Sequence, residues 1–291
     1  MSNHKLKSWV YRSPDRISPH TLHIEVIADY GGGHSTDHAF AEVRNHFLRF
    51  DKGKKIRLVT EHPVFAFSTL ETGFWISQEG LHSEHKDLVI FSNTAPRGDV
   101  VWRGHETQGF VCGILDNGIP IFAVNAGYNL SFVKDRLKGL WEVKVPNVGT
   151  QFRSRDYYPE VTMAILQGNS TKVGKEVNLR EIPAVPNFVV ASVDGYGNLK
   201  TTIRRSYLSD RVLSSKKVKV TINNASHIVL NTLAGGHGKV GELCMVQGSS
   251  GGKNRTYIEF IRMQGRAADD FHIDGPRDDM GKIVIETIRE G

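Results

Sequence analysis

Apolar and polar residues in the first half of the chain follow two patterns, one typical of buried strands and one typical of helices. The strand pattern predicts strands at residues 21–28, 55–60, 88–91, 110–115 and 119–124. Apolar residues such as Val43 and Phe47 recur at helical spacing over 38–50, and the aromatic segment 62–78 comes close to the same spacing. Strands that alternate with helices predict an α/β domain built on a parallel sheet with helices on both faces.

The pattern changes at Pro183-Ala184-Val185-Pro186, where two prolines mark a linker. Beyond it, short strand-like segments separated by Gly and Asn turns are predicted at residues 188–193, 200–204, 217–222, 227–230, 242–246, 256–262 and 282–287. Such a series is typical of a small all-β barrel or sandwich. The predicted organisation is an irregular N-terminal arm (1–20), an α/β domain (21–183) and a C-terminal β domain (187–291).

Composition narrows the class of protein. Hydrophobic residues make up 39% of the 291 and charged residues 23%, which is ordinary for a soluble globular protein. No 18-residue apolar stretch occurs, and the first twenty residues hold no apolar run, so we expect a cytoplasmic protein with no membrane partner. Two cysteines are too few for a disulfide framework or a thiolate zinc site.

The net charge is +6, but the basic residues are scattered and are not interleaved with aromatic residues. A nucleic-acid platform requires both features, so we expect no nucleic-acid partner. His34, Asp37 and His38 are close enough in sequence to share a metal ion, yet no third ligand stands at a diagnostic distance, so no metal is predicted.

Asp29 directly follows the first predicted strand, at the edge where open parallel sheets bind ligands. Its carboxylate offers two acceptor oxygens for the hydroxyls of a ribose, or it closes the turn and caps the next helix. The following Gly31-Gly32-Gly33 has neither the GxGxxG spacing nor a Gly-Lys-Ser/Thr, so a phosphate loop is only weakly indicated.

Three further segments combine polar groups in short turns. Residues 92–98 follow the third strand, and residues 149–156 hold hydroxyls, an amide, two arginines and an acid. The second of these is either a helix N-terminus capped by Ser154 or Asp156, or a loop that holds an anion. Residues 193–198 form either a plain hairpin or a turn that presents Tyr196 to a flat ligand such as a purine.

Taken together, these segments resemble the S-adenosylmethionine (SAM) hydroxide adenosyltransferases and the related SAM-dependent fluorinases and chlorinases. The similarity covers nearly the whole chain after the N-terminal arm. The resembling segments are Asp29-Tyr30-Gly31, Val59–Val64 with Leu70–Phe74, Val124–Gly127, Gln151–Asp156, Val193–Asn198 and Met263–Ala268. They occur in the family's order and with the same division into two domains.

The resemblance implies displacement at the ribose C5′ of SAM, which releases L-methionine and forms adenosine or a 5′-halo-adenosine. It also implies a homotrimer with each site between the N-terminal domain of one subunit and the C-terminal domain of the next, and no cofactor beyond SAM as substrate. Asp29 would hold the ribose with Phe67 packed on it, Asp194 would contact the methionine end, and Tyr196 and Asn198 would face the adenine. The remaining residues expected to contact substrate are Thr94, Gln151, Phe152 and Arg262.

The chain departs from the family at the residues that activate the nucleophile. In the hydroxide-transferring branch, an Asp, an Arg and a His are implicated; the Asp falls on Asn93 here and the His on Arg153, while neither Arg97 nor Arg103 has the spacing of the Arg. Asn and Arg cannot act as a general base near neutral pH. Ser154, by contrast, matches the hydroxyl that the fluorinase branch uses at its halide.

These observations support two readings. In the first, Arg153 and Ser154, with Asn93 nearby, hold an anionic nucleophile aligned with C5′, and the chain is a SAM-cleaving enzyme that uses hydroxide or halide. In the second, catalysis has been lost and the chain is a SAM- or adenosine-binding protein on the same scaffold. Formation of product distinguishes the two.

Overall fold

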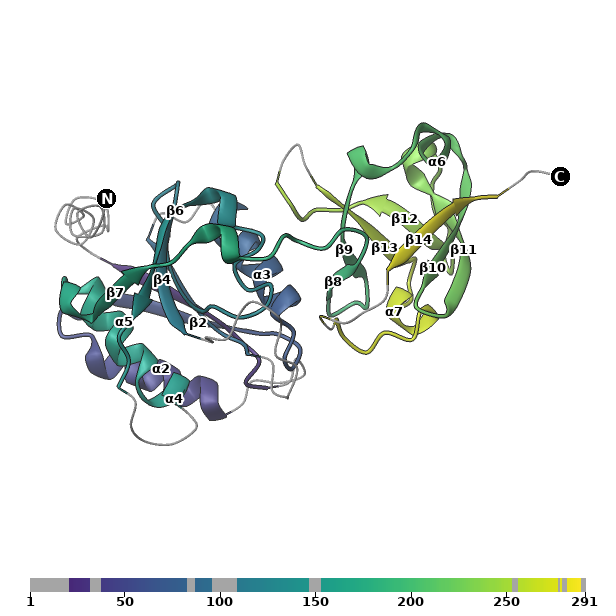
Figure 1. The fold of residues 1–291 in the computed structure, drawn as a ribbon. Coiled ribbons are helices and arrows are strands. Elements are labelled where there is room, and N and C mark those ends of the chain that lie inside the picture. Colours follow the sequence, from purple (N-terminus) through teal and green to yellow (C-terminus); the bar gives the residue numbers. More distant parts are fainter. Residues whose placement is uncertain are drawn as a thin grey trace. The chain divides into compact units, whose positions relative to one another are not determined.

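The chain divides into two units, residues 1–184 and 185–291, and the division falls inside the proline-flanked segment 183–186 (Figure 1). The computed structural model describes residues 21–31, 38–82, 87–95, 109–146, 153–252, 256–276, 278 and 282–288, and for Arg153 it describes the backbone alone. The predicted arm, residues 1–20, lies outside the described residues.

The first unit is built on a seven-stranded sheet with the order β2-β1-β3-β5-β4-β6-β7. In that order, the strands are β2 (Ile56–Pro63), β1 (Leu22–Ala28), β3 (Leu88–Asn93), β5 (Pro120–Val124), β4 (Phe110–Leu115), β6 (Leu137–Val143) and β7 (Val173–Glu176). β2, β1, β3 and β5 are parallel, whereas β4, β6 and β7 pair antiparallel to their neighbours. The sheet is therefore mixed, and the prediction of a parallel sheet holds for four of its strands.

The length of one turn explains the change of direction. β4 ends at Leu115 and β5 begins at Pro120, so only four residues join them. A parallel pair needs a crossover of a dozen residues or more, so these strands must form a hairpin. Gly118 closes the hairpin with a backbone φ of 95°, and its amide donates to the Leu115 carbonyl at 2.9 Å.

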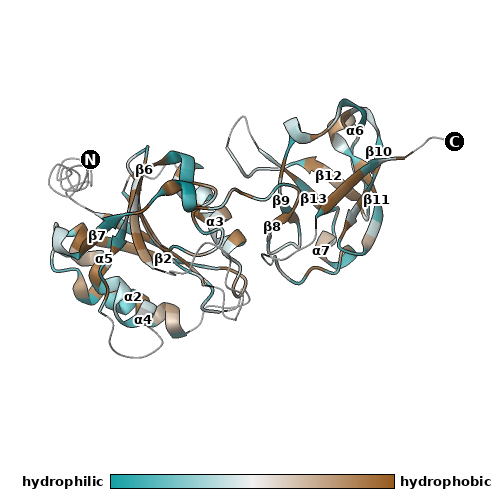
Figure 2. Cartoon of the chain, viewed as in Figure 1, coloured by the Kyte–Doolittle hydropathy of each residue, from teal (hydrophilic) through white to brown (hydrophobic). Residues whose placement is uncertain are grey.

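Helices cover both faces of this sheet, because alternate residues of β1 point to opposite sides. Ile24 and Val26 pack with α2 (His38–Phe50) and α5 (Tyr158–Leu166) in one core, whereas Ile27 packs with α3 (Thr69–Ser77) in another. Figure 2 shows α2 with hydrophobic and hydrophilic residues on the same helix, as expected of an amphipathic helix that covers a sheet. The prediction of helix 38–50 is confirmed residue for residue.

The segment predicted as helical over 62–78 differs in its first part. β2 extends to Pro63, and the helix begins only at Thr69, where the Ser68 hydroxyl accepts a hydrogen bond from Glu71 N at 3.2 Å. A π-helical turn, η1 (Gln78–His82), then extends α3.

The second unit holds another seven-stranded sheet, with the order β14-β10-β11-β12-β13-β9-β8. Its strands in chain order are β8 (Val190–Val193), β9 (Leu199–Arg204), β10 (Lys217–Ile222), β11 (Ala225–Asn231), β12 (Leu243–Gln247), β13 (Tyr257–Arg262) and β14 (Ile283–Thr287). All neighbours pair antiparallel except β11 and β12. All seven strands predicted from the sequence are present. In β10, Val218, Val220 and Ile222 are buried and alternate with more exposed residues.

The remaining helical segments are short. They are α4 (Arg153–Asp156), α6 (Asp210–Ser214), α7 (Ala267–Asp270), and the 3-10 turns η2 (Lys134–Arg136), η3 (Ser170–Lys172), η4 (Leu179–Glu181), η5 (Arg205–Tyr207) and η6 (Thr232–Ala234). Within the described residues, no helix has the length and apolar character needed to cross a membrane.

Candidate functional site

The order of strands in the first unit defines where a ligand is expected. From β1, the chain passes to β2 on one side and then to β3 on the other, so the direction of winding reverses between β1 and β3. In open α/β sheets, the crevice beyond the carboxyl ends of the strands at such a switch point is the usual ligand site. Asp29 follows β1 and Asn93 ends β3, and the Asp29 amide donates to the Asn93 carbonyl at 3.4 Å. Two residues expected at the site therefore lie at this point.

Phe67 joins them from the turn before α3. Its backbone amide donates to the Asp29 carboxylate (N to Oδ2, 3.0 Å), and its φ of 65° is in the left-handed region that residues other than glycine rarely adopt. The ring is 45% exposed, although phenylalanines such as Phe74 and Phe91 in the same unit are fully buried. The carboxylate thus fixes a strained turn that presents an aromatic ring at the surface beside it.

Thr94 lies next to Asn93, but its side chain is held inside the protein. It is fully buried, its hydroxyl accepts a hydrogen bond from Thr72 Oγ1 at 2.8 Å, and its carbonyl accepts one from Asn129 Nδ2 at 2.8 Å. The structure therefore gives Thr94 a role in supporting the turn after β3 rather than an exposed surface for a substrate.

Ser154 approaches the same turn from α4. Burial raises the pKa of Tyr30 well above its ordinary value, and interaction with the Ser154 hydroxyl lowers it by a smaller amount. Among the described residues, the buried Tyr30 hydroxyl has no hydrogen bond of good geometry. Asp29 also acts electrostatically on Tyr30, so the turn after β1 and the start of α4 lie close to one another.

Arg155 fastens α4 to α2. Its guanidinium contacts Glu42 (Nη1 to Oε2, 2.9 Å) and Asp156 (Nε to Oδ1, 3.2 Å), and its carbonyl accepts a hydrogen bond from His46 Nδ1 at 2.8 Å. Asp156 therefore pairs with Arg155. The expected substrate contacts Gln151 and Phe152 lie outside the described residues, and for Arg153 the structure describes only the backbone, in α4.

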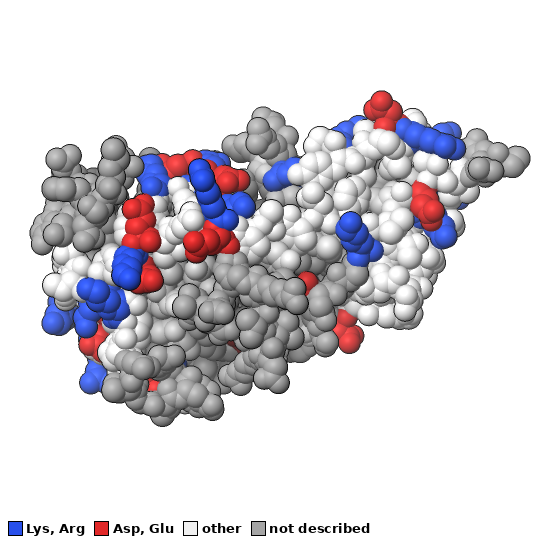
Figure 3. All heavy atoms as spheres, in the orientation of Figure 1, with Lys and Arg blue, Asp and Glu red and all other residues white. Residues whose placement is uncertain are grey.

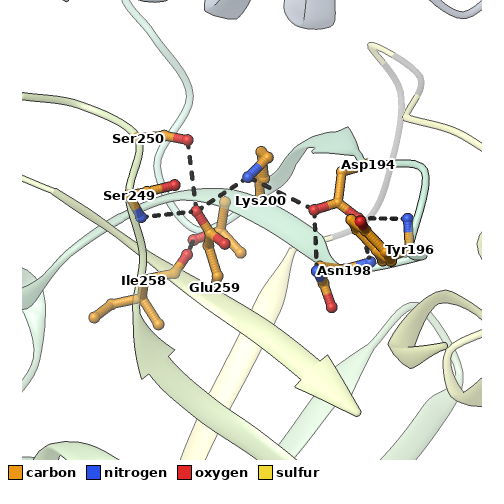
Figure 4. A network of polar contacts seen from close by, with 9 residues as sticks. Asp194, Tyr196, Asn198, Lys200, Ser249, Ser250, Ile258 and Glu259 are labelled. Atoms are coloured by element: carbon orange, nitrogen blue, oxygen red, sulfur yellow. Dashed lines mark hydrogen bonds and ion pairs between the residues drawn. The ribbon is translucent and has the colours of Figure 1, made fainter. Parts of the chain in front are cut away.

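The second unit presents a different group of predicted residues in the turn between β8 and β9 (Figure 4). Asp194 Oδ1 accepts hydrogen bonds from the amides of Tyr196 and Asn198, each at 3.0 Å, and Oδ2 accepts one from Asn198 Nδ2 at 3.0 Å. Gly197 has a φ of 76° and packs so closely on Arg266 that a side chain there would meet it. The result is a closed turn whose Tyr196 is 80% exposed.

Arg262, expected at the substrate, is committed to contacts within the second unit. Its guanidinium is held by both carboxylate oxygens of Asp270 (Nε to Oδ2, 2.6 Å; Nη2 to Oδ1, 2.5 Å), and Nη1 donates to the Gly241 carbonyl. This bidentate pair joins β13 to α7 and raises the pKa of Arg262. The geometry favours a structural role for this arginine.

Three residues in or beside these turns were not singled out from the sequence. Tyr30 was noted only as part of the Asp29 motif, and no pattern marked Lys200 or Glu259, which are buried polar residues. Lys200 on β9 and Glu259 on β13 occupy paired positions of the sheet. The sequence feature that could have indicated them is a charged residue within each of two strands that are otherwise largely buried.

Charge over the described surface is mixed. On the face shown in Figure 3, lysines and arginines lie beside aspartates and glutamates. Arg136, for example, pairs with Asp116, and Lys219 with Glu286. Of the residues considered for a metal, His34 and Asp37 lie outside the described residues, while His38 Nε2 is 3.5 Å from Glu42 Oε1. No group of three His, Cys, Asp or Glu side chains suited to a metal ion is found among the described residues.

Comparison with known proteins shows the fold. No protein-family model matches the chain, and no curated protein matches its sequence. Among solved structures, the chain is similar to the crystal structure of an uncharacterized conserved protein from Thermotoga maritima, with a TM-score of 0.64 and 16% identity. The match covers 90% of this chain and 99% of the Thermotoga protein, so the α/β architecture is shared over almost the full length of both.

Proposed function

We propose that the protein binds S-adenosylmethionine and transfers its adenosyl group to a small nucleophile, hydroxide or halide, with release of L-methionine. The observation that carries this proposal is the Asp29 carboxylate fixed beside the exposed ring of Phe67, at the switch point of the sheet. A carboxylate is an acceptor for the two ribose hydroxyls, and an exposed ring suits the apolar face of the sugar. The family resemblance of the surrounding segments supplies the reaction.

The second unit contributes the other half of the proposed site. Tyr196 is exposed on a turn fixed by Asp194, which suits a purine that stacks on the ring while Asn198 lies beside it. The resemblance places such halves on neighbouring subunits, and we propose the same homotrimer here, with substrate bound between the first unit of one subunit and the second unit of the next. A cytoplasmic address belongs to the same proposal.

We further propose that the sheet of the second unit closes into a barrel. Its two edge strands are β14 and β8. The Ile283 amide, at the start of β14, donates a hydrogen bond of 2.7 Å to the carbonyl of Phe188, two residues before β8. Closure would leave this sheet without a free edge.

In the reaction, the nucleophile forms a bond to C5′, the bond between C5′ and sulfur breaks, and its electron pair passes to sulfur, which becomes the thioether of methionine. Asn93 has no basic site to accept a proton from water. Tyr30 is protonated at neutral pH, because its ordinary pKa of 10.0 is raised further by burial, so the hydroxyls of Tyr30 and Ser154 are donors that favour an anion. We therefore propose that they, with Arg153, hold hydroxide or halide in line with C5′.

Asn93 also supports a second candidate. At the position where the hydroxide-transferring enzymes have an Asp, an Asn leaves no carboxylate for activation of water. The alternative is a protein that binds SAM or adenosine and does not turn it over.

One experiment tests both candidate functions. The purified protein is incubated with SAM, with and without chloride, and the products are separated by chromatography. Adenosine with methionine establishes hydroxide as nucleophile, and chloro-adenosine establishes halide. SAM that stays bound and intact establishes the binding protein. A protein that binds no SAM, adenosine or methionine contradicts both candidates.

Asp29→Asn is expected to weaken SAM binding by about 10- to 100-fold, because the amide loses the negative charge and one acceptor while it keeps the shape of the side chain. The measurement is titration calorimetry with SAM. Asp116→Asn, which removes an exposed carboxylate paired with Arg136, is the control and is expected to bind as the parent does. Equal affinities in all three proteins would remove Asp29 from the site.

A further inference from the structure

A lysine and a glutamate are buried together in the second unit, next to the turn that carries Tyr196. Lys200 on β9 is 8% exposed and Glu259 on β13 is 6% exposed, and the two occupy paired positions of the sheet. Their charged groups are 3.3 Å apart (Nζ to Oε1). Removing two charges from water is costly, so the pair requires contacts that offset its burial.

Besides Lys200, two serines of the segment between β12 and β13 contact the Glu259 carboxylate. Oε1 accepts a hydrogen bond from the Ser249 amide at 3.2 Å and lies 3.5 Å from Ser250 Oγ. Gly248 leaves the space for this carboxylate, because a Cβ at that position would collide with it. Glu259 is thus fixed by the chain between β12 and β13, and it fixes the lysine ammonium in turn.

The ammonium group of Lys200 also faces Asp194. Figure 4 shows Lys200 between the two carboxylates, with its Nζ 3.8 Å from Asp194 Oδ2. That same Oδ2 accepts the hydrogen bond from Asn198 Nδ2, and the other oxygen holds the Tyr196 amide. One cation therefore connects a carboxylate anchored in the sheet to the carboxylate that closes the turn.

We infer that Lys200 is a positioning residue: anchored by Glu259, it holds Asp194 in the rotamer that closes the turn of residues 194–198 and so fixes Tyr196 for a nucleoside. This inference rests on the proposed function. With Tyr196 80% exposed, its backbone hydrogen bond to Asp194 fixes the main chain from which the ring projects. A turn ordered before binding costs the complex less entropy than one that must be ordered by the ligand.

The test compares Lys200→Met, which keeps most of the length and removes the charge, with Lys200→Arg, which keeps the charge. Lys219→Met is the matched control, because it removes an exposed lysine (Nζ 3.4 Å from Glu286 Oε2) from the same sheet. Hydrogen exchange of the free proteins, read by mass spectrometry over residues 194–198, reports on the turn. Calorimetry with adenosine then reports on binding.

In Lys200→Met, we expect the amides of Tyr196 and Asn198 to exchange about 10-fold faster while β9 and β13 stay protected, and adenosine affinity to fall by a similar factor. Lys200→Arg restores both values, and Lys219→Met changes neither. Unchanged exchange over 194–198 overturns the inference, and so does faster exchange spread over the whole sheet, which a merely structural role would give.

Two outcomes are kept apart by this design. If Lys200→Met does not fold, Glu259→Gln, which removes the anchor of the ammonium, is judged by the same exchange criterion. If the parent protein binds no nucleoside, the proposed function fails, whereas exchange in the free proteins still decides whether Lys200 positions the turn.

Discussion

Gly73→Ala is expected to lower the free energy of unfolding of the first unit by about 3 kcal/mol. Gly73 lies in α3 where the helix meets the segment after β5, and a Cβ there would collide with the Tyr128 carbonyl oxygen and lie 3.1 Å from the Phe132 ring. A carbonyl of the main chain cannot rotate away as a side chain can. The helix must therefore move away from this segment, and contacts of Phe74 in the same helix are disturbed with it.

Tryptophan fluorescence during thermal unfolding measures this loss, because all four tryptophans lie in residues 1–184 and the signal follows the first unit alone. A loss of this size corresponds to roughly 6–12 °C in the unfolding midpoint for a unit of this length. Gly80→Ala is the control in the adjoining η1, where the added methyl meets the ends of the Leu115 and Ile90 side chains, at 2.8 and 3.0 Å. These can adjust, so the midpoint should fall less; equal falls would contradict the explanation.

Glu25→Gln is expected to make the stability of the first unit less dependent on pH between about 4.5 and 8. Glu25 is buried on β1, accepts a hydrogen bond from Thr60 Oγ1, and lies 3.6 Å from His23 Nε2 and 3.7 Å from His62 Nδ1. Burial raises the pKa of Glu25 to about 7, with a smaller contribution in the same direction from Glu79, and burial lowers the pKa of His62 to about 4. Folding thus favours the neutral form of both groups.

The sign of the pH dependence follows from these shifts. Because the pKa of Glu25 is higher in the folded chain than its ordinary 4.5, its contribution is fully present below pH 4.5 and is lost as the pH rises to 7. The loss amounts to about 3 kcal/mol, and Gln does not titrate, so the variant gains that much relative to the parent between pH 4.5 and 8. The contribution of His62 is lost in the opposite direction, as the pH falls from 6.5 to 4, and it largely cancels in the difference.

Urea unfolding of both proteins at several pH values, again followed by tryptophan fluorescence, gives this difference directly. Glu160→Gln, which removes a carboxylate at an exposed position of α5, is the control. A pH-independent difference for Glu25→Gln would show that the buried carboxyl does not change its charge in this range.

The local pattern of apolar residues predicted the helices and strands that bury residues at a regular spacing. It failed for elements whose structure is determined by pairing with a distant segment. The helix at 38–50 follows from a helical period of buried residues, and β10 follows from an alternating one, and the sequence displays both. β6 and β7 were not predicted, because β6 combines a glycine, a lysine and Trp141 without a clean alternation, and its strand form comes from pairing with β4. The spacing of apolar residues also does not predict the direction of β4, because the short turn between β4 and β5 determines it.

In the candidate site, too, some features could be predicted from local sequence, whereas others depend on contacts between distant residues. The place of Asp29 at the end of a buried strand was readable from the sequence, and the structure brings Asn93, Phe67 and Ser154 to the same turn. Residue type alone did not show that Thr94 and Arg262 are engaged with other parts of their own unit. The pairing of Lys200 with Glu259 depends on a register between strands 59 residues apart, which no local pattern encodes.

Among the described residues, β2 lies at the edge of the first sheet, which has a consequence for aggregation. An edge strand offers unpaired amides and carbonyls to which a strand of another molecule can add. β2 carries Arg57 and Glu61 and ends in Pro63, whose nitrogen has no hydrogen to donate, and Glu61 is paired with Arg44 of α2. These residues disfavour strand addition along most of β2, and the 48% exposed Leu58 is the point where that protection is weakest.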